Sequence, residues 1–186
     1  MLYFLRNLVK FQTSNDKGFS RLHALRAGDE VLLTGEIFTA RDQAHKRLVE
    51  LIKKGVKLPL DLKGQIIYYC GPTRTPPGKV IGSCGPTTSA RMDKMTEPLL
   101  AYGIKGMIGK GRRSEEVRRS IKKHKAVYFL ATGGAGAFLS KRVLSVKSVC
   151  FKELGPEAIY KVRVKDFPLI VGIDSQGTDI FKRGLS

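Results

Sequence analysis

The sequence predicts an α/β fold: one swivelling β/β/α-type domain in which helices cover a partly parallel sheet. Segments rich in β-branched and apolar residues alternate with segments whose apolar residues recur at helical spacing. Glycine and proline separate these segments at turns. Because strands that alternate with helices form parallel βαβ units, we expect a parallel core at least around residues 104–131.

The first half of the expected fold begins with a strand and a helix. Residues 30–38 (EVLLTGEIF) have the composition of a strand. Residues 41–54 form a helix in this prediction, because Ala44, Leu48 and Leu51 share one face and Gly55 follows as a stop. We then expect a strand at 64–70, a proline-rich loop at 71–78, a short strand at 79–83 and a helix at 89–102.

The second half continues the alternation. Ser114 can cap a helix, and Glu115 and Glu116 place acidic side chains in its first turn. We expect strands at 105–109 and 126–131, a GGAG loop opening a short helix through Arg142, and strands at 146–151, 160–164 and 169–173. Residues 1–20 are an N-terminal arm that the pattern does not place, and residues 21–186 form the domain.

The charge balance predicts a negatively charged partner. The chain has 34 Lys and Arg against 16 Asp and Glu, a formal net charge of +18. A nucleic acid, a small polyanionic substrate and an acidic partner subunit all fit this sign. Aromatic residues make up 8% of the chain without any Trp, which leaves few side chains to stack on bases. A nucleic-acid-binding module is therefore the less favoured alternative function, and we expect the chain to bind no nucleic acid.

The cysteines predict no disulfide framework and no zinc site. They are odd in number, Cys70, Cys84 and Cys150, with no C-x-x-C pair, so buried apolar roles are expected in a reducing cytoplasm. The three histidines, at positions 23, 45 and 124, are too dispersed for a metal site. No segment reaches the roughly 18 uninterrupted apolar residues of a membrane span, so no membrane partner is expected.

Three strand-to-helix junctions carry candidate functional residues: 39–45 (TARDQAH), 85–91 (GPTTSAR) and 106–114 (GMIGKGRRS). Ligands of open α/β sheets bind at such junctions, where free backbone N–H groups face an anion. Arg41, Arg91 and Lys110 add cations that match carboxylates, so together they could hold a small di-anion. Taken singly, an Arg or Lys near a helix end is more often a solvated surface cation, and GPTT is equally consistent with a turn that caps a helix. The GGAG loop lacks the Lys-Ser/Thr of a P-loop.

Six segments together resemble a known family. They are TARDQAHKRL, YYCGPT, GPTTSARMD, GIKGMIGKGRRSEEV, GGAGA and ELGPEAIYKVRVKDFPLIVGIDSQG. In this order they resemble the β-subunit, or C-terminal region, of class I fumarate hydratases and tartrate dehydratases, from about Ala24 to Phe181. In that family an α-subunit holds a four-iron, four-sulfur cluster through its own three cysteines, and one iron acts as a Lewis acid.

The resemblance implies a β-subunit that is active only with its α-subunit, in a dimer of αβ pairs, with no cluster bound by this chain. The reaction would be the reversible hydration of fumarate to malate, or alternatively the dehydration of tartrate. The resemblance assigns binding of the C4 dicarboxylate to Arg41, Arg91 and Lys110 and a catalytic role to Thr87, which needs an activating neighbour to act as a base. These four residues argue against a paralogue that has lost the chemistry.

Overall fold

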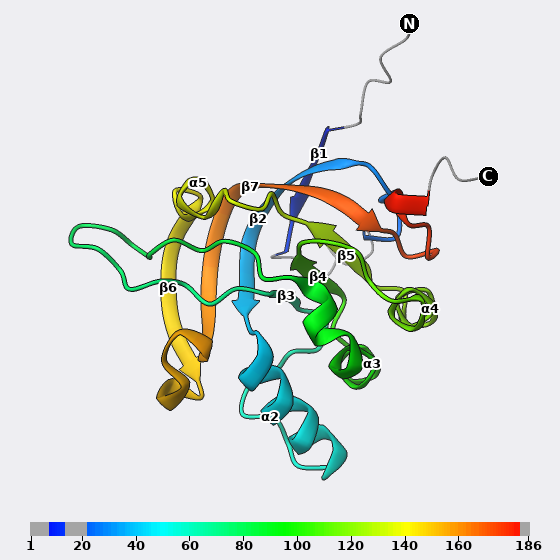
Figure 1. Ribbon diagram of the computed structural model, residues 1–186, viewed down its shortest axis with the longest axis horizontal. Coiled ribbons are helices and arrows are strands. Elements are labelled where there is room, and N and C mark those ends of the chain that lie inside the picture. The colour runs from blue at the N-terminus through cyan, green and yellow to red at the C-terminus, as the bar shows by residue number, and fades with distance from the viewer. Residues whose placement is uncertain (1–7, 14–21, 183–186) are drawn as a thin grey trace, which may run out of the picture.

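The computed structural model describes residues 8–13 and 22–182, and they form an α/β domain (Figure 1). Its strands form one sheet. This sheet is partly parallel, as the sequence predicts. The strands are β1 (Leu8–Gln12), β2 (Glu30–Thr39), β3 (Ile66–Tyr68), β4 (Gly106–Gly109), β5 (Val127–Leu130), β6 (Val143–Cys150) and β7 (Ile159–Ile173).

The sheet closes into a small barrel. Strand order is β1-β2-β3-β4-β5-β7-β6, and β2 also pairs with β7. Strands β2, β3, β4 and β5 are parallel to one another, whereas β7 is antiparallel to both β2 and β5. The expected parallel core around residues 104–131 is therefore confirmed.

Helices follow the parallel strands. They are α2 (Asp42–Lys53), α3 (Asp93–Tyr102), α4 (Glu115–His124) and the short α5 (Gly136–Ser140), with 3₁₀ turns η1 (Ser89–Met92), η2 (Lys152–Glu157) and η3 (Ile180–Lys182). Among the described residues, no helix is long and apolar enough to cross a membrane.

The core has two layers because successive side chains of a strand point to opposite faces of the sheet. In β3, Ile66 and Tyr68 point into the barrel, where they join an apolar cluster with Phe129 and Val164. Ile67 points the other way and packs in a second cluster. That cluster joins the strands to apolar side chains of three helices: Leu48 of α2, Leu99 and Leu100 of α3, and Val117 and Ile121 of α4.

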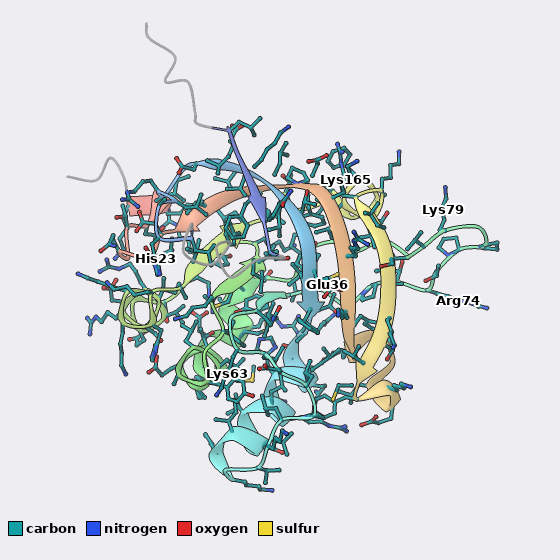
Figure 2. All side chains as sticks on the ribbon, turned by 180° about the vertical axis from the view of Figure 1, so that it is seen from behind. His23, Glu36, Lys63, Arg74, Lys79 and Lys165 are labelled. Atoms are coloured by element: carbon teal, nitrogen blue, oxygen red, sulfur yellow. The ribbon has the colours of Figure 1, made fainter. Side chains whose placement is uncertain are left out.

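Three expected strands differ from the structure. The predicted strand at 79–83 is wrong: residues 72–83 form an irregular arm that projects beyond β6 (Figure 1), and Arg74 and Lys79 extend from it (Figure 2). The arm is closed at its base by the Thr73 N–H, which donates to the Ser83 carbonyl (3.0 Å). Prolines at positions 72, 76 and 77 interrupt the first part of the arm, and residues 79–83 pair with no strand of the sheet.

The predicted strands at 160–164 and 169–173 are one continuous strand, β7. A register shift opposite Leu33 and Gly35, with Asp166 at φ +48°, interrupts the alternation and explains why the sequence suggested two strands. At the other end of the chain, the unplaced arm contributes β1, which pairs in parallel with β2. Residues 1–7 and 14–20 of that arm lie outside the described residues.

Candidate functional site

The carboxyl ends of the parallel strands meet at one rim of the barrel. Backbone hydrogen bonds continue past the strand ends and hold the following segments side by side. The Ala40 N–H donates to the Tyr68 carbonyl (3.0 Å), the Tyr69 N–H to the Ile108 carbonyl (2.8 Å) and the Ala131 N–H to the Gly109 carbonyl (2.8 Å). The junctions after β2, β3, β4 and β5 therefore share this rim.

The GPTT segment lies across the middle of the rim. The Thr87 N–H donates to the Tyr69 carbonyl (2.7 Å), and the Ser89 N–H donates to the Lys110 carbonyl (3.0 Å). A Cβ atom on Gly109 would lie 1.9 Å from Ser89 Oγ, so glycine is needed there for the segment to approach β4 this closely. Thr87 and Lys110 are thus placed on neighbouring backbones.

Arg41 and Arg91 converge on one carboxylate, that of Asp42. Arg91 Nε is 3.0 Å from Asp42 Oδ1, and Arg41 Nε is 3.3 Å from Asp42 Oδ2. Burial alone would raise the pKa of Asp42. Its own backbone N–H and the two guanidinium groups outweigh this and hold the pKa below its usual value. The structure therefore brings together two arginines from different junctions, as expected from the sequence, around an acid that the sequence analysis did not select.

Arg41 is further confined by the chain around it. A Cβ atom on Gly71 would lie 2.9 Å from Arg41 Cδ, so this side chain packs against a position where no side chain fits. Arg41 Nε is also 3.7 Å from Glu157 Oε1, and Glu157 Oε2 accepts a hydrogen bond from the Gln43 N–H (2.7 Å). The η2 turn thereby closes over the start of α2.

Thr87 and Lys110 lie on the same rim and are both partly buried. A Cβ atom on Gly133 would lie 3.6 Å from Lys110 Cδ, so the lysine extends beside the GGAG loop. Within the described part of the chain, neither the Thr87 hydroxyl nor the Lys110 ammonium makes a hydrogen bond or ion pair, and neither contacts the two arginines in that way. Both groups remain available to a ligand.

The buried Arg113, which the sequence analysis did not select, connects the segments that form the rim. The Arg113 side chain has no exposed surface; its Nε donates to Asp93 Oδ1 and its Nη2 to Thr96 Oγ1, both at 2.7 Å. Its guanidinium lies over the rings of Tyr69 and Tyr128, at 5.4 and 5.1 Å from their centroids. The network thus joins the ends of β3, β4 and β5 to the start of α3.

Three further contacts extend this network to the segments of the candidate residues. Asp93 Oδ2 accepts from the Ser114 N–H (2.7 Å), and the Tyr128 hydroxyl lies 2.9 Å from both Ser89 Oγ and the Gly111 carbonyl. The segments on either side of Lys110 and Arg91 are therefore fixed. Nothing in the sequence around Arg112 and Arg113 indicates that one of these two side chains is buried.

His45 is a neutral, buried neighbour of the site. Its Nδ1 is 3.0 Å from the Arg41 carbonyl, and its ring meets the Tyr69 ring edge-on at 5.1 Å. Burial disfavours the imidazolium and lowers the pKa of His45 to about 4, although the hydrogen bond to Arg41 opposes the shift. His45 therefore donates from Nδ1 to Arg41, and its Nε2 has no partner among the described residues.

The cysteines do not fit a cluster. Cys70 and Cys84 lie inside the barrel, and the neighbouring Cys84 thiol together with burial raises the pKa of Cys70. Cys150 packs in the other core layer, among the helices. Across residues 8–13 and 22–182, no group of three or more His, Cys, Asp or Glu side chains could hold a metal ion.

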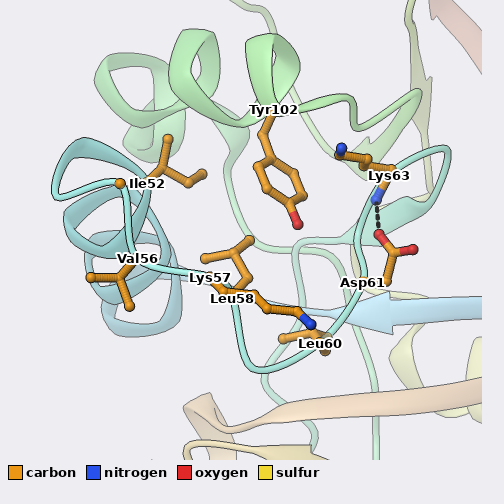
Figure 3. Close-up of a pocket in the computed structure, with 9 residues that line it drawn as sticks. Ile52, Val56, Lys57, Leu58, Leu60, Asp61, Lys63 and Tyr102 are labelled. Carbon is orange, nitrogen blue, oxygen red and sulfur yellow. Dashed lines mark hydrogen bonds between the residues drawn. The ribbon is translucent and has the colours of Figure 1, made fainter.

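One hollow lies away from this rim. It has a volume of about 600 Å³ and is lined at the carboxyl ends of α2 and α3 by Ile52, Leu58, Leu60 and Tyr102 among others (Figure 3). None of the residues selected from the sequence lines it. The candidate site is therefore an open rim on this chain.

The fold and the rim define an α/β domain that carries a convergent set of cations at its strand-to-helix junctions. The family described as "Fumarase C-terminus" matches residues 6–184, and the chain belongs to this family. The predicted family resemblance is thereby confirmed.

The chain is similar to proteins that are much longer than itself and to a protein of similar length. It is 38% identical over 173 residues to "Fumarate hydratase 2" of Leishmania major, covering 92% of this chain and 30% of the relative. It is 42% identical over 153 residues to "Fumarate hydratase class I, anaerobic" of Escherichia coli, covering 81% and 28%. For the "Putative L(+)-tartrate dehydratase subunit beta" of Methanocaldococcus jannaschii, identity is 42% over 164 residues, covering 85% and 84%. The chain thus spans less than a third of the fumarate hydratases and most of the tartrate dehydratase subunit.

Proposed function

We propose that the chain is the β-subunit of a cytoplasmic iron–sulfur hydro-lyase that reversibly hydrates fumarate to malate. Arg41, Arg91 and Lys110 bind the substrate carboxylates, and Thr87 acts at the reacting carbon. The observation that supports this proposal is the convergence of Arg41 and Arg91 from separate junctions on the carboxylate of Asp42, which brings the two guanidinium groups together.

The chemistry of hydration suits a rim of fixed cations. Adding water to fumarate, or removing it from malate, builds negative charge on a carboxyl group in the transition state. Cations already held in place stabilise that charge more than the charge of the ground state, and this difference is what accelerates the reaction. The Arg113 network and the rim's backbone bonds hold the loops that carry Arg91 and Lys110, so little reorganisation is needed during the reaction.

The cluster belongs to the α-subunit in this proposal. The thiols of Cys70 and Cys84 are buried inside the barrel and Cys150 lies in the other layer, so they cannot converge on one cluster. When bound in the complex, the cluster would supply a Lewis acid for the substrate hydroxyl. The open rim and the similarity to a separate β-subunit support a partner that completes the site.

Tartrate is the second candidate substrate. The relative from Methanocaldococcus jannaschii is named as a tartrate dehydratase subunit, and the chain covers 84% of it. Both substrates are C4 dicarboxylates, so the same arginines serve either one. The extra hydroxyl of tartrate would have to be recognised by groups in the complete complex, and rates on L(+)-tartrate and malate would distinguish the two.

Anaerobic reconstitution tests the proposal. We expect the isolated chain to bind no cluster and to convert no fumarate, whereas the complex with its α-subunit hydrates fumarate. In that complex, Arg91→Lys keeps the charge but loses the bidentate fork, so KM should rise and kcat should fall together. Arg119→Lys, at an exposed position of α4, is the control. An isolated chain that turned brown with stoichiometric iron and made malate would refute the two-subunit proposal.

A further inference from the structure

The geometry points to Asp42 as a positioning residue: its carboxylate holds the Nε side of both arginines, so that their Nη edges face the substrate. This inference rests on the proposed function for its kinetic consequence, because it concerns how Arg41 and Arg91 meet a dicarboxylate. Asp42 would not touch the substrate. It would act through the two guanidinium groups that do.

The division of contacts on Asp42 supports this role. Each of its oxygens serves one arginine, Oδ1 for Arg91 and Oδ2 for Arg41, and in both cases the nearest arginine atom is Nε. Among the described residues, no hydrogen bond reaches an Nη atom of either arginine. The Nη atoms therefore have no hydrogen-bond partner among the described residues, although Arg41 Nη1 lies beside Gly71. An edge of two Nη atoms can bind a carboxylate through two parallel hydrogen bonds.

Arg91 depends on Asp42 more than Arg41 does. The Arg91 side chain is 53% exposed, and Asp42 is its one ionic partner in the part of the chain that the structure describes. Arg41 has a second acid nearby, Glu157, and packs against Gly71. Without Asp42, the Arg91 side chain would sample several rotamers in solvent. The entropic cost of ordering this side chain would then arise when the substrate binds.

An acid at the start of a helix also has an ordinary role, because it interacts favourably with the helix dipole. That role involves the backbone alone and does not require either arginine. Asp42→Asn removes the charge and therefore affects both roles. The arginine signals separate them, because losing a helix-dipole interaction alone would leave the Arg91 Nε–H signal in place. Asp42→Ser is a second variant with the same logic and a smaller side chain.

The arginine Nε–H groups report the clamp directly in the isolated chain, by ¹H–¹⁵N correlation spectroscopy. We expect Asp42→Asn and Asp42→Ser to shift the Nε–H signals of both Arg41 and Arg91. Glu157→Gln should shift the Arg41 signal only, and Glu50→Gln, at an exposed position of the same helix, should shift neither. An Arg91 signal that stays in place in both Asp42 variants overturns the inference.

Kinetics of the complex provide the second readout. Asp42→Asn adds net positive charge near the substrate. This attraction offsets the cost of ordering Arg91, so ground-state binding should not weaken, but the arginines lose their alignment. We therefore expect kcat to fall about tenfold with KM unchanged or lower, which differs from the joint effect expected for Arg91→Lys. A KM that rises several-fold while kcat is kept contradicts the inference. The spectroscopic test needs no α-subunit, so a wild-type complex without hydro-lyase activity would refute the proposed function and leave the clamp testable.

Discussion

Thr87 is the candidate residue whose chemistry is most demanding, because a threonine hydroxyl is a very weak acid in water. Its backbone N–H is bonded to Tyr69, and its hydroxyl makes no hydrogen bond with a described residue. We expect Thr87→Val to lower kcat of the complex by about 100-fold or more if the hydroxyl transfers the proton. Steady-state kinetics with fumarate and malate measure this.

The adjacent Thr88 is an internal control for that experiment, since its side chain is exposed and it forms the backbone bridge to Lys110. Thr88→Val should leave kcat within about twofold, well short of a proton-transfer effect. If Thr87→Val changes mainly KM, the hydroxyl orients the substrate and the proton is moved by another group.

His45 should make stability depend on pH in a defined window. Burial lowers the pKa of His45 to about 4 in the folded chain, whereas in the unfolded chain it titrates near 6.5. The unfolded state therefore binds the proton first. The free energy of unfolding is unaffected by this residue above pH 6.5 and decreases as pH falls toward 4, by roughly 3 kcal/mol at most.

Denaturant titrations of the wild type and His45→Gln across pH 4 to 8 measure this contribution. Glutamine does not titrate, so the variant should lose less stability than the wild type between pH 6.5 and 4. His23→Gln, at an exposed position, should keep the wild-type slope. Identical slopes in the wild type and His45→Gln would show that His45 charges freely in the folded chain.

The sequence located the arginines of the site but missed the acid between them. The sequence allowed a prediction of Arg41, Arg91 and Lys110, because a cation at a strand-to-helix junction is a local pattern. Asp42 and Arg113 depend on which side chains meet after folding, which one sequence does not contain. An acid directly after Arg41 looks like an ordinary residue of a helix first turn until Arg91 is placed beside it.

At the scale of elements, the Arg113 network is the feature most sensitive to change. Arg113→Met leaves the Asp93 carboxylate largely buried without its charged partner, and breaking such a pair costs about 3–5 kcal/mol. We expect that loss in the free energy of unfolding, measured by urea denaturation. Arg112→Met, which removes only a contact over the Phe181 ring, should cost about 1 kcal/mol or less.

Elements with a strong local signal were predictable. Helix α4 begins as the sequence predicts. Ser114 caps it, with Oγ accepting from the Val117 N–H, and its first turn is acidic. The arm at 72–83 and the continuity of β7 were not predictable in the same way. An apolar run such as 79–83 becomes a strand only if a neighbour pairs with it, and a bulge is decided by the partner strand. Barrel closure by the β2–β7 pair likewise has no local signature.

At the scale of the whole molecule, the excess of positive charge is not matched by exposed aromatic rings that could stack on bases. No Asp or Glu occurs between Val117 and Lys152, yet among the described residues Phe138 is the one aromatic ring counted as an exposed large hydrophobic side chain. Its ring is already covered by Arg142, at 5.3 Å. Base stacking therefore has little support.

We expect binding to duplex DNA or RNA to be weak and to be lost between about 50 and 200 mM salt, as counterion release alone predicts. Fluorescence anisotropy with labelled duplexes of unrelated sequence measures it, and all sequences should bind alike. A sequence-selective complex that survives physiological salt would favour a nucleic-acid-binding function instead.

The position of β7 in the chain has a consequence for synthesis on the ribosome. β7 pairs with β2, β5 and β6, and Glu30 of β2 has Ile170 as its partner. While the chain grows, β2 emerges early, and its β7 edge waits unpaired until residues 159–173 leave the exit tunnel. An unpaired edge is a template for pairing with other chains. A nascent or prematurely terminated chain is therefore the form most prone to aggregate, and protection by a chaperone matters most just before β7 emerges.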